Sequence, residues 1–329
     1  MSLKAVIYNA VTTPLRVAAN LINPPAVILI YHRVTNLEID THQLAVSPDN
    51  FNDQIDYLKR SHNLINADEF VHLLKTKKKF PKRTMLITFD DGYADNYLEA
   101  LPILETHNAQ AIFYITTSNL NTNQELWWDE LERIMFTASH IPDELGFDND
   151  GKFLSYPTAT KEEAIQSHNK MHPIVKWQLP LQRENTLASL RKQVQLNANG
   201  RTTHRLMTFD ELKQMSKSHS TVIGAHTHSH SPLSIFNKEE QLMEMKKSKD
   251  ILEQLLSIKI NHASYPFGTK KDFNIDSINV CNELGFEMTC ANYYDQIHTW
   301  SNIQALPRAL VRNWNLEEFK KKVAGFYRY

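Results

Sequence analysis

The chain has 329 residues, of which 42% are hydrophobic, enough to bury the core of one large α/β domain or two smaller ones. It carries 36 basic and 37 acidic residues, a formal net charge of -1, which disfavours a nucleic-acid-binding surface and a polybasic membrane-binding surface. Only two cysteines are present, Cys281 and Cys290, which excludes a disulfide framework.

The first 25 residues are predicted to form a helical N-terminal extension. Polar residues interrupt their apolar positions, so the segment lacks the pattern of a secretory signal. It also lacks the run of about twenty apolar residues that spans a bilayer. We therefore expect an amphipathic helix on the protein surface, with a helix at a membrane surface as the alternative. We also expect a cytoplasmic or membrane-proximal location and no transmembrane segment.

From residue 26 onward, strand-like apolar runs alternate with helical patterns. Strands are expected at residues 26–31, 85–89, 111–115 and 221–224, before Tyr265, and near residues 286–290. Helix starts are indicated by Ser47-Pro48 and by capping-box spacings at Asn66–Glu69 and Thr208–Glu211. Repeated β-α units predict a parallel sheet whose functional loops follow the carboxyl ends of its strands. Residues 26–329 are expected to form one catalytic domain.

The alternation of strands and helices is interrupted from about residue 121 to residue 199, and this interval is predicted to be a helical insertion. Helices are expected at residues 130–137 and 183–195, separated by a polar loop through residues 148–151. Trp127 and Trp128 have two interpretations: an exposed platform for sugar stacking, or side chains buried in the core. The insertion is expected to wall one side of a cleft.

Asp90, Asp91 and Gly92 end the apolar run at residues 85–89. Two adjacent carboxylates repel each other unless a cation, a shared proton or hydrogen bonds offset the cost. The alternative is an ordinary strand-to-loop transition, in which one aspartate caps the following helix and the other is solvated, because acidic residues are common in such loops. Since Gly92 permits a sharp turn, both carboxylates could face one site at the end of the strand.

Three histidines, His226, His228 and His230, occupy alternating positions after the strand expected at residues 221–224. Neutral imidazole is a common ligand of zinc-like metals, whereas a polar surface cluster is the alternative interpretation. One carboxylate and two imidazoles would make a three-ligand site with open coordination positions, as a hydrolytic metal requires.

These stretches resemble the motifs of a known family. Thr88-Phe-Asp-Asp-Gly92, His226-Thr-His-Ser-His230 and Tyr265-Pro-Phe-Gly268 occur in the order found in the NodB-homology polysaccharide deacetylases, carbohydrate esterase family four. The resemblance implies a deformed (β/α) barrel with a divalent metal, zinc by default and cobalt, nickel or iron as alternatives. It makes Asp91, His226 and His230 the metal ligands and Asp90 the catalytic base. It also implies substrate or oxyanion contacts at Tyr265 and Phe267.

Two departures from the usual family pattern point to a subgroup. The residues before the Pro-aromatic-Gly turn lack the usual arginine, and no late Leu-x-His motif supplies the catalytic acid. In relatives that resemble poly-N-acetylglucosamine deacetylases, the acid lies instead on an N-terminal strand that ends in Tyr-His. Tyr31-His32 matches this, which makes His32 the expected acid. Arg308 is a candidate for the absent arginine, with a surface arginine after a turn as the alternative.

The resemblance implies a metal-dependent hydrolase that removes N-acetyl groups from a sugar or polysaccharide and releases acetate. The expected partner is a carbohydrate with N-acetyl groups, and no nucleic acid is expected. His226-Thr-His228 also fits the His-x-His pair of amidohydrolase barrels, although that pair normally follows the first strand. Two further interpretations are a barrel hydrolase acting on small cyclic amides and an inactive carbohydrate-binding protein.

Overall fold

The computed structural model describes residue 20 and residues 22–327. The helical extension predicted for residues 1–25 falls almost wholly outside these described residues. Within the described part of the chain, no helix has the length and apolar character needed to cross a membrane.

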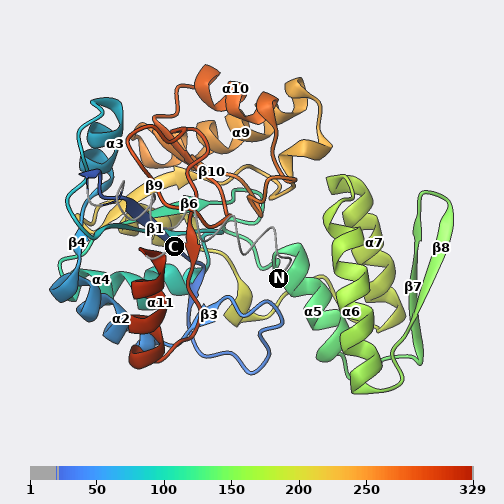
Figure 1. The fold of residues 1–329 in the computed structure, drawn as a ribbon. Helices are drawn as coiled ribbons and strands as arrows, with labels where there is room; N and C mark the ends of the chain where they lie inside the picture. The colour runs from blue at the N-terminus through green and yellow to red at the C-terminus, as the bar shows by residue number, and fades with distance from the viewer. Residues whose placement is uncertain (1–19, 21, 328–329) are drawn as a thin grey trace, which may run out of the picture.

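A parallel sheet forms the centre of the molecule (Figure 1). Its strands follow the spatial order β11 (Met288–Cys290), β10 (His262–Ser264), β9 (Thr221–Ala225), β6 (Ala111–Ile115), β5 (Thr84–Phe89), β1 (Ala26–Tyr31) and β12 (Ala309–Leu310). All of these pairs are parallel, and β4 (Asn63–Leu64) adds to the start of β5. A bridge between Cys290 and Leu306 brings the two edges towards each other. The sheet is therefore a curled, incomplete barrel, which confirms the predicted deformed (β/α) barrel.

The strand register brings the ends of distant segments together. Tyr31 pairs with Phe89 across β1 and β5, so His32 and Asp90 leave the sheet side by side. Ile115 pairs with Ala225 across β6 and β9, which places the start of the histidine loop at the same edge. All six residues of β1 and all six of β5 are buried, as expected for strands covered on both faces.

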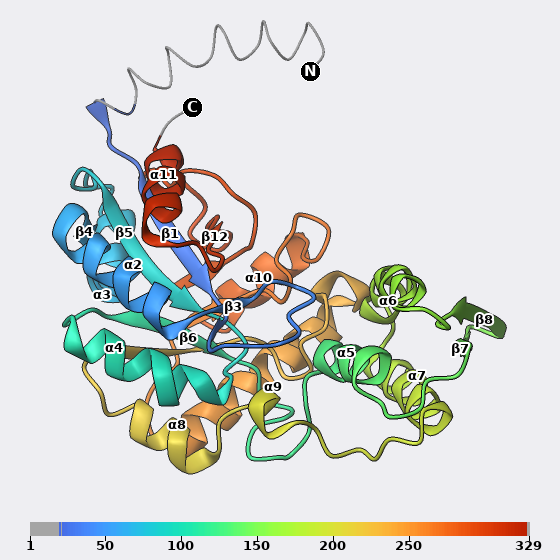
Figure 2. The ribbon, with the colours of Figure 1, turned by 90° about the horizontal axis from the view of Figure 1, so that it is seen from below.

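Most helices pack around the outside of the sheet (Figures 1 and 2). They are α2 (Pro48–Ser61), α3 (Ala67–Lys75), α4 (Leu101–Thr106, preceded by a π-helical turn at Asn96–Ala100), α8 (Phe209–Met215), α9 (Lys238–Leu256), α10 (Ile275–Glu283) and α11 (Leu316–Phe326). The predicted helix starts are confirmed, because the side chains of Ser47, Asn66 and Thr208 accept hydrogen bonds from the first turns of α2, α3 and α8.

The remaining elements stand together to one side of the sheet in both ribbon views (Figures 1 and 2). They are α5 (Trp127–Phe136), the antiparallel hairpin of β7 (Glu144–Asn149) and β8 (Lys152–Pro157), α6 (Lys161–Lys176) and α7 (Pro180–Gln193). The loop predicted at residues 148–151 is the turn of this hairpin. The sequence analysis predicted neither the hairpin nor α6. A second short parallel pair, β2 (Arg33–Val34) and β3 (Ala45–Val46), lies on the path from β1 to α2.

Candidate active site

Asp90 and Asp91 lie where β5 ends. Both are buried, with exposed fractions of 3% and 1%. The backbone turns sharply, since Asp91 has a φ of 76° and Gly92 a φ of 89°. A β-carbon on Gly92 would lie 3.1 Å from Cγ2 of Ile115, so glycine serves both the positive φ and the close approach of β6.

The histidine loop brings two imidazoles to this pair. Nδ1 of His226 lies 2.9 Å from the carbonyl oxygen and 2.6 Å from Oγ of Ser264, so Nε2 is directed towards the aspartates. This Nε2 is 3.6 Å from Oδ2 of Asp90 and 3.6 Å from Oδ1 of Asp91. Nε2 of His230 lies 3.1 Å from the same Oδ1 of Asp91. The two ends of the histidine loop therefore converge on Asp91.

The middle histidine has a different environment. Nδ1 of His228 lies 3.0 Å from Oγ1 of Thr117, and His228 is absent from the lining of the pocket that contains His226 and His230. Left-handed backbone at Thr227 and His230, with φ of 62° and 50°, interrupts the extended pattern, and the loop separates two histidines that face Asp91 from one that does not.

Asp91, His226 and His230 could hold a metal ion. All three are buried, and one potential ligand atom from each lies within 4.8 Å of the others. Burial lowers the pKa of His226 to about 4 and that of His230 to about 3, which keeps both imidazoles in the neutral form that binds metals. Burial also raises the pKa of Asp91, and a cation would offset the cost of its charge. Two nitrogens and one oxygen, with open positions, suit a zinc-like ion.

Arg308 contacts Asp90 through both of its terminal nitrogens. The Nη1–Oδ1 and Nη2–Oδ2 distances are both 2.7 Å, and Arg308 is 1% exposed. Nε of Arg308 donates to the carbonyl oxygen of Ala291 at 2.8 Å. Burial would raise the pKa of Asp90, but Arg308, together with His226, holds it well below its usual value. The alternative of a surface arginine at position 308 is therefore wrong.

His32 faces the same pocket from the end of β1. It lines a cavity of about 270 Å³ together with Asp90, Asp91, His226 and His230. Burial lowers the pKa of His32, whereas Asp91 and Asp90 raise it. Its Nδ1 is buried and has no hydrogen-bond partner among the described residues.

The Tyr265–Gly268 turn contributes one ring to the pocket and keeps another in the core. Phe267 has a φ of 58° and lines the pocket, with its ring centre 4.8 Å from that of His230. Tyr265 is 1% exposed, and its hydroxyl donates to the carbonyl oxygen of Gln304 at 2.7 Å. Tyr265, expected from the sequence to contact the substrate or oxyanion, is absent from the lining of this pocket.

Three lining residues that the sequence analysis did not assign to the site come from α5 and α6: Trp128, His172 and Lys176. Nζ of Lys176 lies 2.5 Å from Oδ1 of Asp272 and 4.2 Å from the ring centre of Phe267. Trp127 and Trp128 are 7% and 4% exposed, which supports burial over an exposed platform. The Trp127-Trp128 pair was a usable sequence signal, whereas His172 and Lys176 belong to no recognised motif.

Comparison with known proteins agrees with this geometry. A sequence model of the family described as polysaccharide deacetylase matches residues 77–141 and 184–289. The matched ranges contain Asp90, Asp91, His226, His230 and Phe267, and they omit the whole hairpin and the whole of α6. The chain belongs to the polysaccharide deacetylase family.

Individual relatives match over shorter lengths. A poly-beta-1,6-N-acetyl-D-glucosamine N-deacetylase of Staphylococcus aureus is 37% identical over 93 residues, which are 28% of this chain and 31% of the relative. The chain thus matches only about a third of the length of such curated relatives, from 30% to 37%.

Solved structures match over nearly the whole chain. The Streptococcus pyogenes deacetylase PplD in complex with acetate has a TM-score of 0.60 at 17% identity, over 92% of this chain and 99% of that one. IcaB from Ammonifex degensii has a TM-score of 0.58 at 15% identity, over 92% of this chain and 97% of that one. At these identities the likeness establishes the shared fold.

Proposed function

We propose that this protein removes N-acetyl groups from an N-acetylated glycan and releases acetate. The observation that carries the proposal is the convergence of a buried, arginine-paired carboxylate, Asp90, and a histidine, His32, on one pocket that also contains Asp91, His226 and His230. An acid, a base and a set of metal ligands in one cavity are what amide hydrolysis requires.

Asp91, His226 and His230 are the proposed ligands of one divalent metal, with zinc as the first candidate and cobalt, nickel or iron as alternatives. When bound, the metal would supply Lewis-acid polarisation of the amide carbonyl and lower the pKa of water. The contact between His226 Nδ1 and Ser264 fixes the tautomer that leaves Nε2 free for this role.

Asp90 is the proposed general base. Its carboxylate accepts a proton from the attacking water, and its pairing with Arg308 keeps it ionised at neutral pH. The water oxygen forms a bond to the amide carbon as the carbonyl oxygen gains negative charge. The backbone N–H of Phe267, in the turn beside the pocket, is the proposed donor to that oxygen.

His32 is the proposed general acid. It gives its proton to the amide nitrogen as the C–N bond breaks, so the sugar leaves as a free amine and the acyl part as acetate. Asp90 and Asp91 favour the protonated form of His32 against the effect of burial. The acid and the base thus come from the ends of neighbouring strands, β1 and β5.

The proposed substrate is a glycan of N-acetylated amino sugars, in line with the substrate for which the Staphylococcus aureus relative is named. We propose residues 26–329 as the catalytic unit and residues 121–199 as an insertion within it. The contribution of Trp128, His172 and Lys176 to the pocket lining supports a substrate-binding role for this insertion.

The test is acetate release from a panel of N-acetylated oligosaccharides, including β-1,4- and β-1,6-linked N-acetylglucosamine oligomers. The protein is loaded with zinc, cobalt, nickel or iron in separate samples, and its metal content is measured. Acetate release that depends on the metal supports the proposal. A folded, metal-loaded protein that releases no acetate from any glycan contradicts it.

A further inference from the structure

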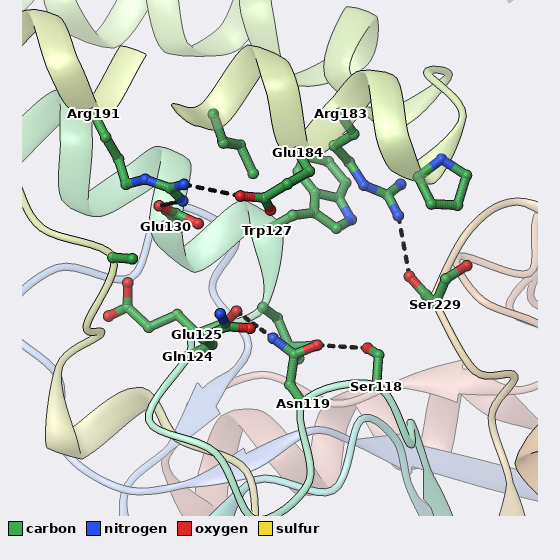
Figure 3. Close-up of a pocket in the computed structure, with 14 residues that line it drawn as sticks. Ser118, Asn119, Gln124, Glu125, Trp127, Glu130, Arg183, Glu184, Arg191 and Ser229 are labelled. Atoms are coloured by element: carbon green, nitrogen blue, oxygen red, sulfur yellow. Dashed lines mark hydrogen bonds and ion pairs between the residues drawn. The ribbon is translucent and has the colours of Figure 1, made fainter. Parts of the chain in front are cut away.

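Figure 3 shows a second cavity, of about 160 Å³, that is separate from the catalytic pocket. α7 and the start of α5 form part of its wall, and loop residues such as Asn119 and Ser229 complete it. Trp127 lines this cavity, whereas its neighbour Trp128 lines the catalytic pocket. The two cavities therefore share a wall at the start of α5.

Arg183 on this wall is a buried cation without a carboxylate partner. It is 5% exposed and reaches from α7 towards Ser229 (Figure 3). Its Nη2 donates to the carbonyl oxygen of Ser229 at 3.1 Å and to Oγ of Ser231 at 2.9 Å. Among the described residues, its buried Nη1 has no hydrogen-bond partner, and no carboxylate oxygen forms an ion pair with the guanidinium within 4.0 Å. Buried arginines are normally paired with an anion, so this site lacks one.

Trp127 presents a second donor without an acceptor. Its Nε1 is buried and has no hydrogen-bond partner among the described residues. The guanidinium carbon of Arg183 lies 5.4 Å from the centre of the Trp127 ring, so the two donors are neighbours. Buried donors are usually satisfied, so these two unsatisfied donors beside one cavity are available to an acceptor group that binds there.

The carboxylates on the wall do not fill this role because other arginines hold them. Glu125 pairs with Arg133 at 2.8 Å. Arg191 pairs with Glu130 at 2.5 Å and with Glu184 at 2.8 Å (Figure 3). The positive charge of Arg183 therefore remains available to a ligand. Burial lowers the pKa of Arg183 to about 10, although Glu244 and Glu184 act in the opposite direction.

The wall also carries groups that suit a sugar. Asn119 and Gln124 add amides, and Glu130 and Glu184 add carboxylate oxygens that can accept from hydroxyl groups. The volume exceeds what a single water molecule requires. Small, polar and next to an aromatic ring, the cavity suits one sugar unit better than a hydrophobic ligand.

We propose that this cavity binds an acidic sugar unit of the substrate glycan, with its carboxylate against Arg183 and Nε1 of Trp127. The inference rests on the proposed function, because it places the acidic unit next to the sugar that is deacetylated. Nη1 of Arg183 and Nε1 of Trp127 are both buried within the wall, so both side chains turn towards the carboxylate when it binds. Arginine suits this role because its planar fork can hold both carboxylate oxygens.

Isothermal titration calorimetry tests the ligand class. Sodium glucuronate is the probe, glucose is the neutral-sugar control and sodium acetate is the free-anion control. We expect glucuronate to bind at least tenfold more tightly than either control. Equal binding of glucose overturns the need for an anion, and equal binding of acetate overturns the need for a sugar.

Three variants test the location. Arg183→Gln and Ala198→Trp should each weaken glucuronate binding at least tenfold. Ala198 is an exposed lining residue, so the tryptophan narrows the cavity while Arg183 stays in place. Arg205→Gln is the matched control, because Arg205 pairs with Glu211 and lines neither cavity. Unchanged binding in Ala198→Trp overturns the location, even if Arg183→Gln fails to fold.

Turnover separates this proposal from the proposed function. Glucuronate carries no N-acetyl group, so its binding is measured without catalysis. If no glycan yields acetate, the proposed function fails while the binding result stands. If acetate is released, Ala198→Trp should lower kcat/KM at least tenfold more for an acidic N-acetylated oligosaccharide than for a neutral one. An equal effect on both substrates overturns the assignment.

Discussion

Arg308 holds both carboxylate oxygens of Asp90, with two N–O distances of 2.7 Å in a fully buried setting. The two residues are far apart in sequence but adjacent at the mouth of the barrel, since β12 follows Arg308 directly and pairs with β1. A bidentate pair fixes the plane of the carboxylate as well as its charge. Asp90 is thus both ionised and oriented.

Removal of Arg308 should shift the pH dependence of activity. Arg308 lowers the pKa of Asp90, so in Arg308→Gln the opposing effect of burial should prevail and raise that pKa. The acid limb of the kcat/KM profile should then move to higher pH, which kinetics across pH 4–9 would detect. Arg308→Lys keeps the charge and should shift the limb less. An unmoved limb in Arg308→Gln would remove Asp90 as the base.

The same variant should be less stable at neutral pH. A carboxylate whose pKa is lower in the folded state contributes stability above its unfolded pKa of about 3.9, and this contribution is lost as the pH falls through the folded value. Breaking a buried pair typically costs about 3–5 kcal/mol. Urea unfolding should show that Arg308→Gln has a much lower free energy of unfolding than the unsubstituted protein at pH 7, and that this difference becomes smaller at low pH. A loss that grows as the pH falls would contradict this linkage.

Substitution of the two aspartates should separate chemistry from metal binding. Asp90→Asn should keep the metal and lose activity by roughly 100-fold or more, because the base is gone. Asp91→Asn should lose both the metal and the activity, because a proposed metal ligand is weakened. Elemental analysis after dialysis, alongside acetate release, distinguishes these outcomes. Metal loss in Asp90→Asn with retention in Asp91→Asn would reverse the assignment.

Loss of His32 should depend on the leaving group. In His32→Ala, hydrolysis of an N-acetyl glycan should fall roughly 100- to 10,000-fold, because a poor amine leaving group requires a proton. Hydrolysis of 4-nitrophenyl acetate should change little, since nitrophenolate leaves without protonation. Equal losses on the two substrates would mean that His32 is not the acid.

Lys176 should be required for stability, while a neighbouring lysine should not. Lys176→Met leaves Asp272, which is 0% exposed, without its cation, and the expected loss is about 3–5 kcal/mol. Lys170→Met on the exposed face of the same helix should change stability by less than about 0.5 kcal/mol. Thermal unfolding of both variants tests this. Equal melting temperatures would show that the Lys176–Asp272 pair contributes nothing.

Local patterns were sufficient to predict most of the barrel. Strands β1 and β5 could be predicted from their continuous apolar runs, and two helix starts from the capping residues Ser47 and Thr208. Both signals depend only on residues that are close together in the sequence. The hairpin and α6 were missed. β8 alternates poorly, with only partial burial along its length, and α6 contains Pro173, which normally indicates a helix end.

The sequence pointed to pocket residues where a short motif contains them, and it missed those that only packing brings to the pocket. Asp90, Asp91, His226 and His230 lie in two contiguous stretches directly after strands. His172 and Lys176 reach the pocket only because α6 packs beside α5, and no local spacing encodes that contact. Tyr265 belongs to a recognised motif, but its side chain is buried in the core and does not line the pocket.

Three pocket residues, Asp91, His230 and Phe267, adopt left-handed backbone conformations with φ values of 76°, 50° and 58°. Each such conformation costs a residue with a β-carbon about 1–3 kcal/mol, a cost that the surrounding structure must offset. Glycine at these positions would relieve the cost but remove the side chain. Attempts to engineer a more heat-resistant protein should therefore leave these positions unchanged and seek gains on the outer helices.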